Sequence, residues 1–533
     1  MKRITSILLT LALMIGGSAM AQIQIPGGPI KPPVPPVKQR LKPKAKARPK
    51  KQVKYYDVTF NCNAPDADLY IDGNFVGDAN IIWTLKAGSH AVKVVTDYYN
   101  DYSTTVKVSS SNKSFDLNLT EKTDAESQFQ IGINYHEGRS GFPQDYDQAL
   151  NYFAMAAEKG YVPAITWIGY CFKTGHGITQ DFQEAVKWFT LAAEQGNSAA
   201  QNNLGHCYQF GLGVEKDYSK AIEWYRMAAY QGYASAQNNL GFCYEEGWGV
   251  AQDYDEAFRW YMKAANQGNT TAQDNIAQCY KRGHGVPKNY TEAVKWHRMA
   301  AEQGSAVAQN NLAMCYENGV GVEKDYDMAV YWYQKSADQG AVGAIHNLGM
   351  CYYLGHGVPQ SYFEAAMRFR EAAEQGYASS QYMLGYCFEA GKGAEQNYNA
   401  AVKWYRKAVE QGHANAQNNL GVCYYAGRGV TQSYTEAVEL FRMSAKQGNP
   451  PAQCNLGNCY FEGKGVKKDR KEAVNWFYQA AAKGHAEAQY RLADCYHHGY
   501  GVKKNKQEAI NWYQKAANQG YAKAVSSLRE LGN

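Results

Sequence analysis

Ten cysteines recur along this chain at one spacing, and regularly spaced thiols could form disulfides or hold a metal ion. They lie 36 residues apart, at positions 171, 207, 243, 279, 315, 351, 387, 423, 459 and 495. A fixed period of that size indicates a solenoid of stacked units. Equivalent residues of stacked helices lie about 9 Å apart, whereas a disulfide needs Cα atoms within about 7 Å. We therefore predict that these cysteines are small apolar core residues.

The remaining residues of reactive type do not form a catalytic or metal-binding pattern either. No second thiol or histidine recurs within ligand reach of the repeated cysteines. The Gly-x-Gly pairs lack the preceding strand and the third glycine of a dinucleotide-binding loop. Histidines fall at expected turns or helix ends, at His176, His284, His356, His497 and His498. We expect no catalytic, cofactor-binding or metal-binding residue, and therefore no enzyme.

The 36-residue unit itself predicts two amphipathic helices. In the unit from Gly232 to Gln267, one helical face is formed by Ala236, Leu240, Cys243 and Tyr244. A second face follows with the same spacing, formed by Tyr254, Ala257, Trp260, Tyr261, Ala264 and Ala265. A single helix pair cannot bury both faces, so neighbouring units must stack on one another.

The segment between the two helices predicts a tight reversal of the chain. Gly247 and Gly249 tolerate positive φ values, so the chain can turn between the helices at little steric cost. Asp253, followed three residues later by Glu256, is typical of a capping box that opens the second helix. An equivalent pair recurs in eight of the eleven units, which makes a chance match improbable as the explanation.

The repeated motifs resemble the Sel1-like repeat (SLR), a relative of the tetratricopeptide repeat. They are A-x-A-Q-x-N-L-G-x-C-Y, then G-x-G-V, D-Y-x-x-A, W-Y, A-A and Q-G. The resemblance extends over residues 125–531 and implies a right-handed α/α superhelix with a scaffold or adaptor role, and no chemistry. We predict a mainly α solenoid of about eleven helix-turn-helix repeats over residues 124–531, closed by a capping helix from Tyr521.

Variation between the repeats suggests where such a solenoid would bind a partner. In the tetratricopeptide frame, the first helix of each unit lines the concave groove. The early units place mostly polar residues there, such as Asn202, Gln209 and Glu245. The later units place larger apolar and aromatic residues there, namely Met350, Tyr353, Leu354, Tyr382, Tyr386, Tyr425, Phe461 and Tyr490. Since aromatic residues are favoured at interface hot spots, we expect these eight to bind a protein partner.

Two segments precede the folded part. Residues 1–21 begin with Lys2 and Arg3, continue with an apolar run and end in Ala19-Met20-Ala21, which is typical of a cleaved signal peptide. Retention of this segment as an anchor remains the alternative, and no later stretch is apolar enough to span a membrane. Residues 22–54 hold eight prolines and ten Lys or Arg, which predicts an extended linker.

Residues 55–120 alternate apolar and polar positions with a period of two, which predicts a small all-β domain. Asp72-Gly73, Gly77 and Lys86-Ala87-Gly88 are expected at turns between its strands. The segments ADLYIDGNFVG and LKAGSHAVKVVTDYY resemble the PEGA domain of bacterial envelope proteins. That resemblance implies a surface-binding module without catalytic residues.

These features favour an exported, non-enzymatic scaffold of the bacterial envelope, periplasmic, secreted or on the cell surface. The alternative is a protein that binds envelope glycan or peptidoglycan, with the basic linker and the β-domain contacting the polymer. A third interpretation, that the protein is a cell-wall hydrolase, is based only on the names of some family members. Nucleic acid is not expected as a partner, because all twelve basic residues before Asp57 belong to the leader and linker, and the rest of the chain is acidic overall.

Overall fold

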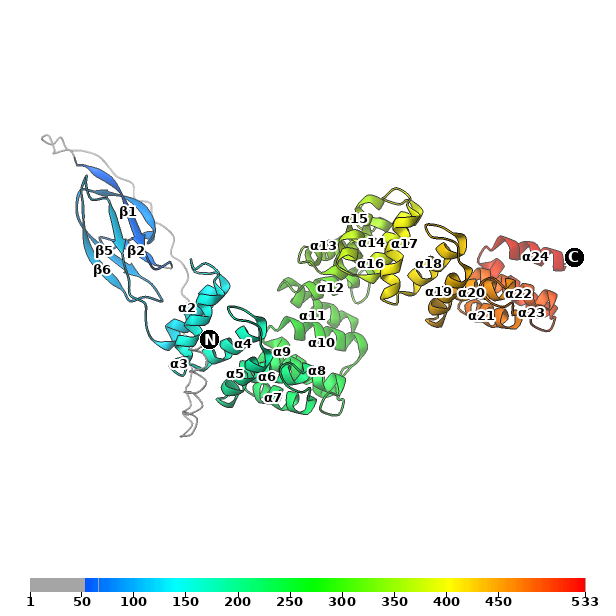
Figure 1. The fold of residues 1–533 in the computed structure, drawn as a ribbon, viewed down its shortest axis with the longest axis horizontal. Coiled ribbons are helices and arrows are strands. Elements are labelled where there is room, and N and C mark those ends of the chain that lie inside the picture. Colours follow the sequence, from blue (N-terminus) through cyan, green and yellow to red (C-terminus); the bar gives the residue numbers. More distant parts are fainter. Residues whose placement is uncertain (1–52, 66, 533) are drawn as a thin grey trace. The chain divides into compact units, whose positions relative to one another are not determined.

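The computed structural model describes residues 53–65 and 67–532. The predicted signal peptide and the predicted linker up to residue 52 lie outside these ranges. The chain divides between Ala264 and Ala265 into two compact units. The first unit contains the β-domain and the early repeats, and the second contains the later repeats (Figure 1).

Seven strands form the β-domain, in two sheets. The strands are β1 Tyr55–Cys62, β2 Asp68–Ile71, β3 Asn74–Asp78, β4 Ile81–Lys86, β5 Gly88–Val95, β6 Tyr102–Val108 and β7 Ser114–Leu117. One sheet has the order β4-β1-β7, with β1 and β7 parallel, and the other has the order β3-β2-β5-β6. Alternate residues of both sheets, such as Phe60 and Val94, are buried in one shared core. The predicted β-domain is therefore a sandwich.

The turn predicted at Gly77 is wrong, because Gly77 lies inside β3. It pairs with Leu69 of β2 next to a shift in register, and its φ is 131°. Glycine inside a strand is typical of such a bulge. This glycine made the short, polar strand β3 difficult to recognise in the sequence. The turn that joins β2 to β3 lies at Asp72-Gly73, whose φ values are 51° and 80°.

The first repeat packs against the β-domain. Ile131 and Phe142 of this repeat are buried in the core of the sandwich. The Tyr152 hydroxyl donates a hydrogen bond to Glu121 at 2.7 Å. The β-domain thus covers the end of the stack, which explains why this repeat carries Asn134 in place of the repeated cysteine.

The helices of the first unit follow one another in pairs. They are α2 Ala125–Glu137, α3 Tyr146–Glu158, α4 Val162–Thr174, α5 Phe182–Glu194, α6 Ser198–Phe210, α7 Tyr218–Tyr230 and α8 Ala234–Glu246, and α9 Tyr254–Asn266 crosses the division between the units. Each pair packs around alanine, cysteine and aromatic residues that are almost fully buried, including Cys171, Trp188 and Phe189.

The second unit continues the same pairing to the C-terminus. Its helices are α10 Thr270–Arg282, α11 Tyr290–Glu302, α12 Ala306–Asn318, α13 Tyr326–Ala337, α14 Val342–Leu354, α15 Tyr362–Glu374, α16 Ala378–Ala390, α17 Tyr398–Glu410, α18 Ala414–Ala426, α19 Tyr434–Lys446, α20 Pro450–Glu462, α21 Arg470–Ala482, α22 Ala486–His498, α23 Lys506–Asn518 and α24 Ala522–Gly532. The predicted mainly α solenoid, preceded by a small β-domain, is confirmed.

The second helix of each repeat begins at the predicted cap, but with only half of a capping box. The Glu256 amide donates to the Asp253 side chain at 3.0 Å, as expected. The Asp253 amide, however, donates to the carbonyl of Tyr244 at 2.9 Å. Glu256 is therefore not needed to satisfy that amide, and its side chain instead pairs with Arg259. The same backbone bond closes the loop in other repeats, for example between Ser361 and Tyr352.

Two glycines shape the loop between paired helices, each for a different reason. Gly355 ends α14 in the left-handed region, with φ of 75°. Gly357 also has positive φ, of 68°, and it packs directly on the backbone of the preceding repeat. A Cβ at Gly357 would overlap the carbonyl group of Tyr326, the first residue of α13. The second glycine thus permits close contact between neighbouring repeats.

No helix in the described part of the chain is long and apolar enough to cross a membrane.

Candidate functional site

The eight predicted partner-binding residues lie on the first helices of successive repeats in the second unit. Met350, Tyr353 and Leu354 belong to α14, and Tyr382 and Tyr386 belong to α16. The remaining three come from α18, α20 and α22, as Tyr425, Phe461 and Tyr490. We call these eight residues the late-repeat surface. Its members contact different neighbours, so it consists of several small clusters.

Tyr353 and Tyr386 meet around one cation. The Lys392 ammonium, from the loop after α16, donates a hydrogen bond to the Tyr353 hydroxyl at 2.7 Å. The same ammonium lies 4.9 Å from the Tyr353 ring centroid, 4.8 Å from that of Tyr362 and 5.8 Å from that of Tyr386. The Tyr353 hydroxyl raises the pKa of Tyr386, and hydrogen bonding to Tyr353 raises the pKa of Lys392. Lys392 thus stays charged among three aromatic rings.

Tyr425 belongs to a similar cluster, two repeats after Tyr353. Lys464 donates to the Tyr425 hydroxyl at 3.0 Å and forms an ion pair with Glu462 at 2.8 Å. The hydrogen bond from Lys464 lowers the pKa of the Glu462 carboxyl group, so this residue is charged at neutral pH. The Lys464 ammonium also lies over the ring of Tyr434, 5.6 Å from its centroid.

A hollow of about 240 Å³ opens beside Tyr425. Its lining comes from α18, α19, α20 and α22, through Val422, Tyr425, Phe441, Asn455, Asn458, Glu462 and Arg491. The Nε of Arg491 has no hydrogen-bond partner within the described ranges, and its nearest carboxylate, Glu487, is 3.7 Å away. The hollow therefore offers an apolar ring, amide groups, a guanidinium donor and a carboxylate acceptor within one small space.

Phe461, Tyr490 and Tyr382 each contact residues outside these clusters. The guanidinium of Arg470 lies between Phe461 and Tyr500, 5.3 Å and 4.5 Å from the two ring centroids. Tyr490 packs near the C-terminus, 5.3 Å from Tyr521. Tyr382 stacks on His413 at 5.0 Å, and burial raises its pKa. Tyr382 is thus largely a packing residue between repeats.

Met350 and Leu354 complete the late-repeat surface. Met350 is half-buried against the core of its repeat, beside Tyr353. Leu354 is 45% exposed and is the most accessible apolar member. Aromatic residues also occupy the equivalent positions of early repeats, since Phe210 stands where Leu354 does and is 54% exposed. Phe242, the counterpart of Tyr386, packs edge-on against Trp248 at 5.1 Å.

Sequence reasoning missed a rule that links the surface to the core. The second helix carries a large buried ring, which is tyrosine in repeats where the first helix has a hydrogen-bond acceptor 16 residues earlier. The Tyr333 hydroxyl donates to the Glu317 carboxylate at 2.7 Å, and the Tyr405 hydroxyl donates to that of Glu389 at 2.5 Å. The ring is phenylalanine where that earlier residue is aromatic, in the pairs Tyr353 with Phe369, Tyr425 with Phe441, and Phe461 with Phe477. The offset of 16 residues in these pairs was visible in the sequence, but other repeats depart from it, since Phe189 follows Lys173 by 16 residues and the Tyr513 hydroxyl donates to Asp494, 19 residues earlier.

An asparagine ladder connects the first helices of neighbouring repeats. Asn347 donates to the side chain of Asn310 at 3.0 Å, and Asn455 donates to that of Asn418 at the same distance. The ladder is structural, and its partners in these two pairs are side chains. It is interrupted where Tyr382 replaces asparagine, and Asn419 donates to the Tyr405 hydroxyl there.

The repeated cysteines are buried, so their predicted role in the core is confirmed. Burial raises the pKa of the thiols, to about 12 for Cys243 and Cys351 and to about 11 for Cys387. Histidines of the loops stack on tyrosines of the preceding repeat, as His356 does on Tyr326 at 4.2 Å. Within residues 53–65 and 67–532, no group of three or more His, Cys, Asp or Glu side chains is placed to hold a metal ion.

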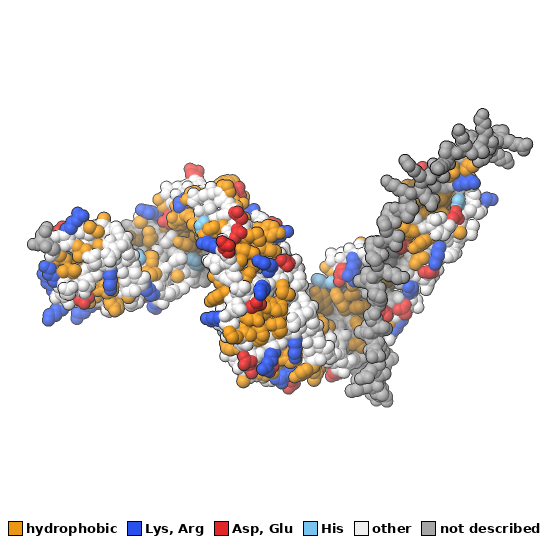
Figure 2. All heavy atoms as spheres, turned by 180° about the vertical axis from the view of Figure 1, so that it is seen from behind, with side chains coloured by type: hydrophobic (Ala, Val, Ile, Leu, Met, Phe, Trp, Pro, Cys, Tyr) orange, Lys and Arg blue, Asp and Glu red, His pale blue; other side chains and the backbone are white. Residues whose placement is uncertain are grey.

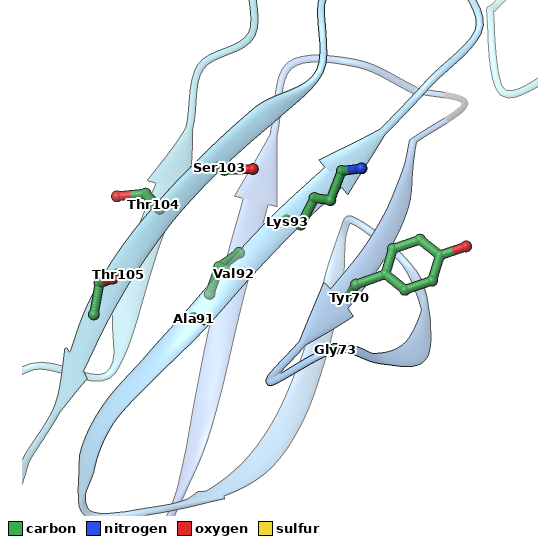
Figure 3. Close-up of a pocket in the computed structure, with 8 residues that line it drawn as sticks. All are labelled: Tyr70, Gly73, Ala91, Val92, Lys93, Ser103, Thr104 and Thr105. Atoms are coloured by element: carbon green, nitrogen blue, oxygen red, sulfur yellow. The ribbon is translucent and has the colours of Figure 1, made fainter.

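A second hollow, of about 350 Å³, lies on the four-stranded sheet of the β-domain (Figure 3). Tyr70, Lys93 and Ser103 stand opposite one another on β2, β5 and β6, so their side chains share one face. Ala91 and Thr105 form the next row on that face, where the small alanine leaves space beside the tyrosine ring. This hollow combines an aromatic ring with hydroxyl groups and one cation.

Comparisons with known families cover nearly all of the described chain. The profile of the Sel1 repeat matches residues 125–161, 162–197, 198–233, 234–269, 270–305, 306–340, 342–377, 378–413, 414–449, 450–485 and 486–521. The profile of the PEGA domain matches residues 55–124. A search of curated proteins found no significant match.

Two solved structures illustrate the likeness. One is c5321, described as a protective antigen of uropathogenic Escherichia coli with an SLR fold, with 37% identity and a TM-score of 0.60 over 77% of this chain and 87% of that one. The other is a Sel1 repeat protein from Oxalobacter formigenes, with 33% identity and a TM-score of 0.43 over 46% of this chain and 96% of that one.

Proposed function

The chain belongs to the Sel1 repeat family, and from this premise we propose that it is an exported, non-enzymatic scaffold that holds a protein partner on its late-repeat surface. The observation that carries the proposal is the hollow beside Tyr425, where an aromatic ring, two asparagines, Glu462 and Arg491 converge. Such a mixture of apolar and hydrogen-bonding groups suits a polypeptide, because a peptide supplies side chains, amide donors and carbonyl acceptors together.

A catalytic role finds little support in the same residues. The thiols of the repeats are buried with raised pKa values, so at neutral pH they are protonated and poor nucleophiles. The hydroxyls of Tyr353 and Tyr425 accept hydrogen bonds from Lys392 and Lys464 of the following loops. A scaffold accounts for these arrangements without a reaction, and a cell-wall hydrolase does not.

The test is crosslinking in cells, followed by mass spectrometry, with a matched pair of variants. Leu354→Ala with Tyr386→Ala removes accessible side chains of the late-repeat surface and leaves the stacked Tyr382 intact. Phe210→Ala with Phe242→Ala changes the same two positions in early repeats and serves as the control. We expect a partner crosslink to disappear in the first variant and to persist in the second. Equal loss in both variants, or no loss in either, would contradict the proposal.

Binding of an envelope glycan is a second candidate function, and the hollow on the β-domain favours it. Tyr70 offers a ring face, and Lys93, Ser103 and Thr105 offer the polar groups that a sugar polymer would contact. We expect Tyr70→Ala to weaken sedimentation of the protein with purified cell-wall sacculi. Tyr55→Ala, which removes a 63% exposed ring from the other sheet, should leave it unchanged. Unchanged sedimentation of both variants would exclude this hollow as the glycan site.

We also propose that the protein is exported, because residues 1–21 resemble a signal peptide and residues 55–124 match the PEGA domain. Fractionation of cells that express the full chain tests it, with a reporter that is active only outside the cytoplasm fused after residue 533. A reporter that stays inactive would contradict export.

A further inference from the structure

The loops of the last two complete repeats differ from all earlier ones in charge. In ten of the eleven repeats, the loop between paired helices ends in the motif Gly-x-Gly-x-x-x-x, whose fifth and sixth residues vary. In two earlier repeats these residues are a glutamate followed by a lysine, as in Glu215-Lys216 and Glu323-Lys324. In the last two complete repeats they are Lys467-Lys468 and Lys503-Lys504. Among the ten loops with this motif, the pair is doubly positive only in these two successive loops.

Further lysines extend this charge into the helices that follow. We call the set of Lys467, Lys468, Lys471, Lys503, Lys504 and Lys506 the basic edge. All six side chains are exposed, and none forms an ion pair within the ranges that the structure describes. Asp469, which lies among them, is used as a helix cap, with its carboxylate accepting from the amides of Lys471 and Glu472. Basic side chains accordingly gather at the C-terminal end of the second unit, on the left of Figure 2.

The basic edge adjoins the hollow beside Tyr425. Glu462 of the hollow pairs with Lys464, and the same loop reaches Lys467 three residues later. Arg470, the first residue of α21, follows Lys468 by two residues, and its guanidinium lies 5.3 Å from the ring centroid of Phe461, the residue before Glu462 in α20. The hollow and the basic edge are therefore parts of one continuous surface.

We propose that this surface binds an extended, acidic segment of a protein partner, with the peptide backbone in the hollow and the carboxylates along the basic edge. The proposal rests on the scaffold function and specifies the chemistry of the partner. Unpaired lysines attract carboxylates and steer their approach. Within the hollow, Arg491 can donate to a peptide carbonyl, and Glu462 can accept from a peptide amide.

Two observations favour a peptide over other polyanions. A polyphosphate carries only acceptors, so the carboxylate of Glu462 would repel it from the hollow. A single-stranded nucleic acid needs open ring faces for base stacking. Here Arg470 already lies over Phe461 and Tyr500, at 5.3 and 4.5 Å from their centroids.

The experiment compares two charge-reversal variants of the chain from residue 22 onward. The test variant changes Lys467, Lys468, Lys503 and Lys504 to Glu. The control variant changes Lys216, Lys288, Lys324 and Lys403 to Glu, of which the first three occupy the same loop position as Lys468 in earlier repeats. Both variants have the same net charge and keep the basic linker. The probe is a short fluorescein-labelled peptide of alternating Glu and Ala, measured by fluorescence anisotropy at about 0.1 M ionic strength, where the Debye length is about 10 Å, with circular dichroism as a check on folding.

We expect the test variant to bind the peptide at least about tenfold more weakly than the unaltered chain, and the control variant to bind within about twofold of it, since exposed charges act over roughly a Debye length. Arg491→Gln should also weaken binding, because it removes the donor in the hollow while leaving the basic edge. Equal weakening by both charge variants would overturn the proposal, since net charge or the linker would then explain binding. Inorganic polyphosphate that binds more tightly than the peptide, and loses binding in the test variant alone, would overturn it in favour of an anionic polymer.

The outcome is separable from that of the scaffold proposal. If the Leu354 and Tyr386 variant loses its partner in cells while the Lys-to-Glu test variant retains it, the scaffold proposal stands and the acidic segment is refuted. If neither variant loses a partner, both proposals fail together.

Discussion

The loop glycines permit a sharp test of how neighbouring repeats are joined. Gly340 and Gly357 both lie in the second unit and both have positive φ, of 79° and 68°. A Cβ at Gly340 would meet no atom within 4 Å, whereas one at Gly357 would overlap the Tyr326 carbonyl group and lie 3.0 Å from the Asp327 amide nitrogen. Alanine at the two positions therefore carries the same backbone cost but a different packing cost.

The magnitudes follow from these geometries. Left-handed backbone costs an alanine roughly 1–2 kcal/mol, so Gly340→Ala should lose about that much stability. Gly357→Ala adds an overlap with backbone that cannot rotate away, and overpacking of that kind costs about 1–3 kcal/mol or more. We expect the second substitution to cost about 2 kcal/mol more than the first, which corresponds to roughly 30-fold in a local opening equilibrium.

Hydrogen exchange measured by mass spectrometry is the appropriate assay, because a repeat protein need not unfold in one step. Gly357→Ala should accelerate exchange in α13 and α14, on both sides of the contact. Gly340→Ala should show a smaller acceleration, centred on the end of α13. Equal effects of the two alanines would refute the idea that the second loop glycine exists to let repeats approach.

Three further predictions follow from the packing. Tyr405→Phe removes the hydroxyl that donates to Glu389 at 2.5 Å and should lower the free energy of unfolding, measured in urea, by about 1–2 kcal/mol. Adding Glu389→Tyr should recover part of this loss, because it recreates the pair formed by Tyr353 and Phe369. A double variant less stable than the single variant would contradict the rule. Burial raises the pKa of a thiol such as Cys243 to about 12, from 9.0 in the unfolded state. The contribution of the buried thiol to the stability of the folded state is complete below pH 9. It is lost between pH 9 and pH 12, where the thiol ionises in the unfolded state but stays protonated in the folded state. Each such thiol should therefore cost about 1.4 kcal/mol at pH 10, and Cys243→Ala should flatten the pH dependence of thermal unfolding above pH 9; an unchanged slope would refute the assignment. Ile131→Ala leaves a cavity in the core shared by the sandwich and the first repeat, should destabilise it by about 2–4 kcal/mol and should accelerate hydrogen exchange in both α2 and the β-strands. Ile168→Ala, in the next repeat, should leave the strands protected. Protected strands in both variants would show that the first repeat does not support the sandwich.

The repeats were predictable because their signals are local and written many times. The thiols every 36 residues, the aspartate, asparagine or serine before each second helix and the first glycine of each loop act within one repeat. Averaging over eleven copies removes the ambiguity that single helices carry. Strand β3 was missed for the opposite reason, since it occurs once and contains Gly77 at an irregular register.

The contacts of the late-repeat surface were not predictable in the same way. Its aromatic residues could be placed on the first helices, but the cations that cover them come from the following loop, 39 residues later in the case of Tyr353 and Lys392. Helical periodicity reveals which residues share a face of one helix, and it carries no information on which side chain of the next repeat reaches that face. The hollow beside Tyr425 likewise requires residues of four helices.

The two hydrogen-bond systems of the solenoid set different conditions on how such a chain can grow by duplication. The bond between Glu389 and Tyr405 lies inside one repeat, so a copied repeat brings both partners along. The bond between Asn347 and Asn310 joins two repeats, so a copied repeat fits only beside a neighbour that offers the matching side chain. Where Tyr382 stands in place of the asparagine, a repeat can no longer be exchanged freely for its neighbours. A recombination event at that point would create an interface between repeats in which this hydrogen bond cannot form. We therefore expect the order of the repeats on either side to stay fixed during evolution.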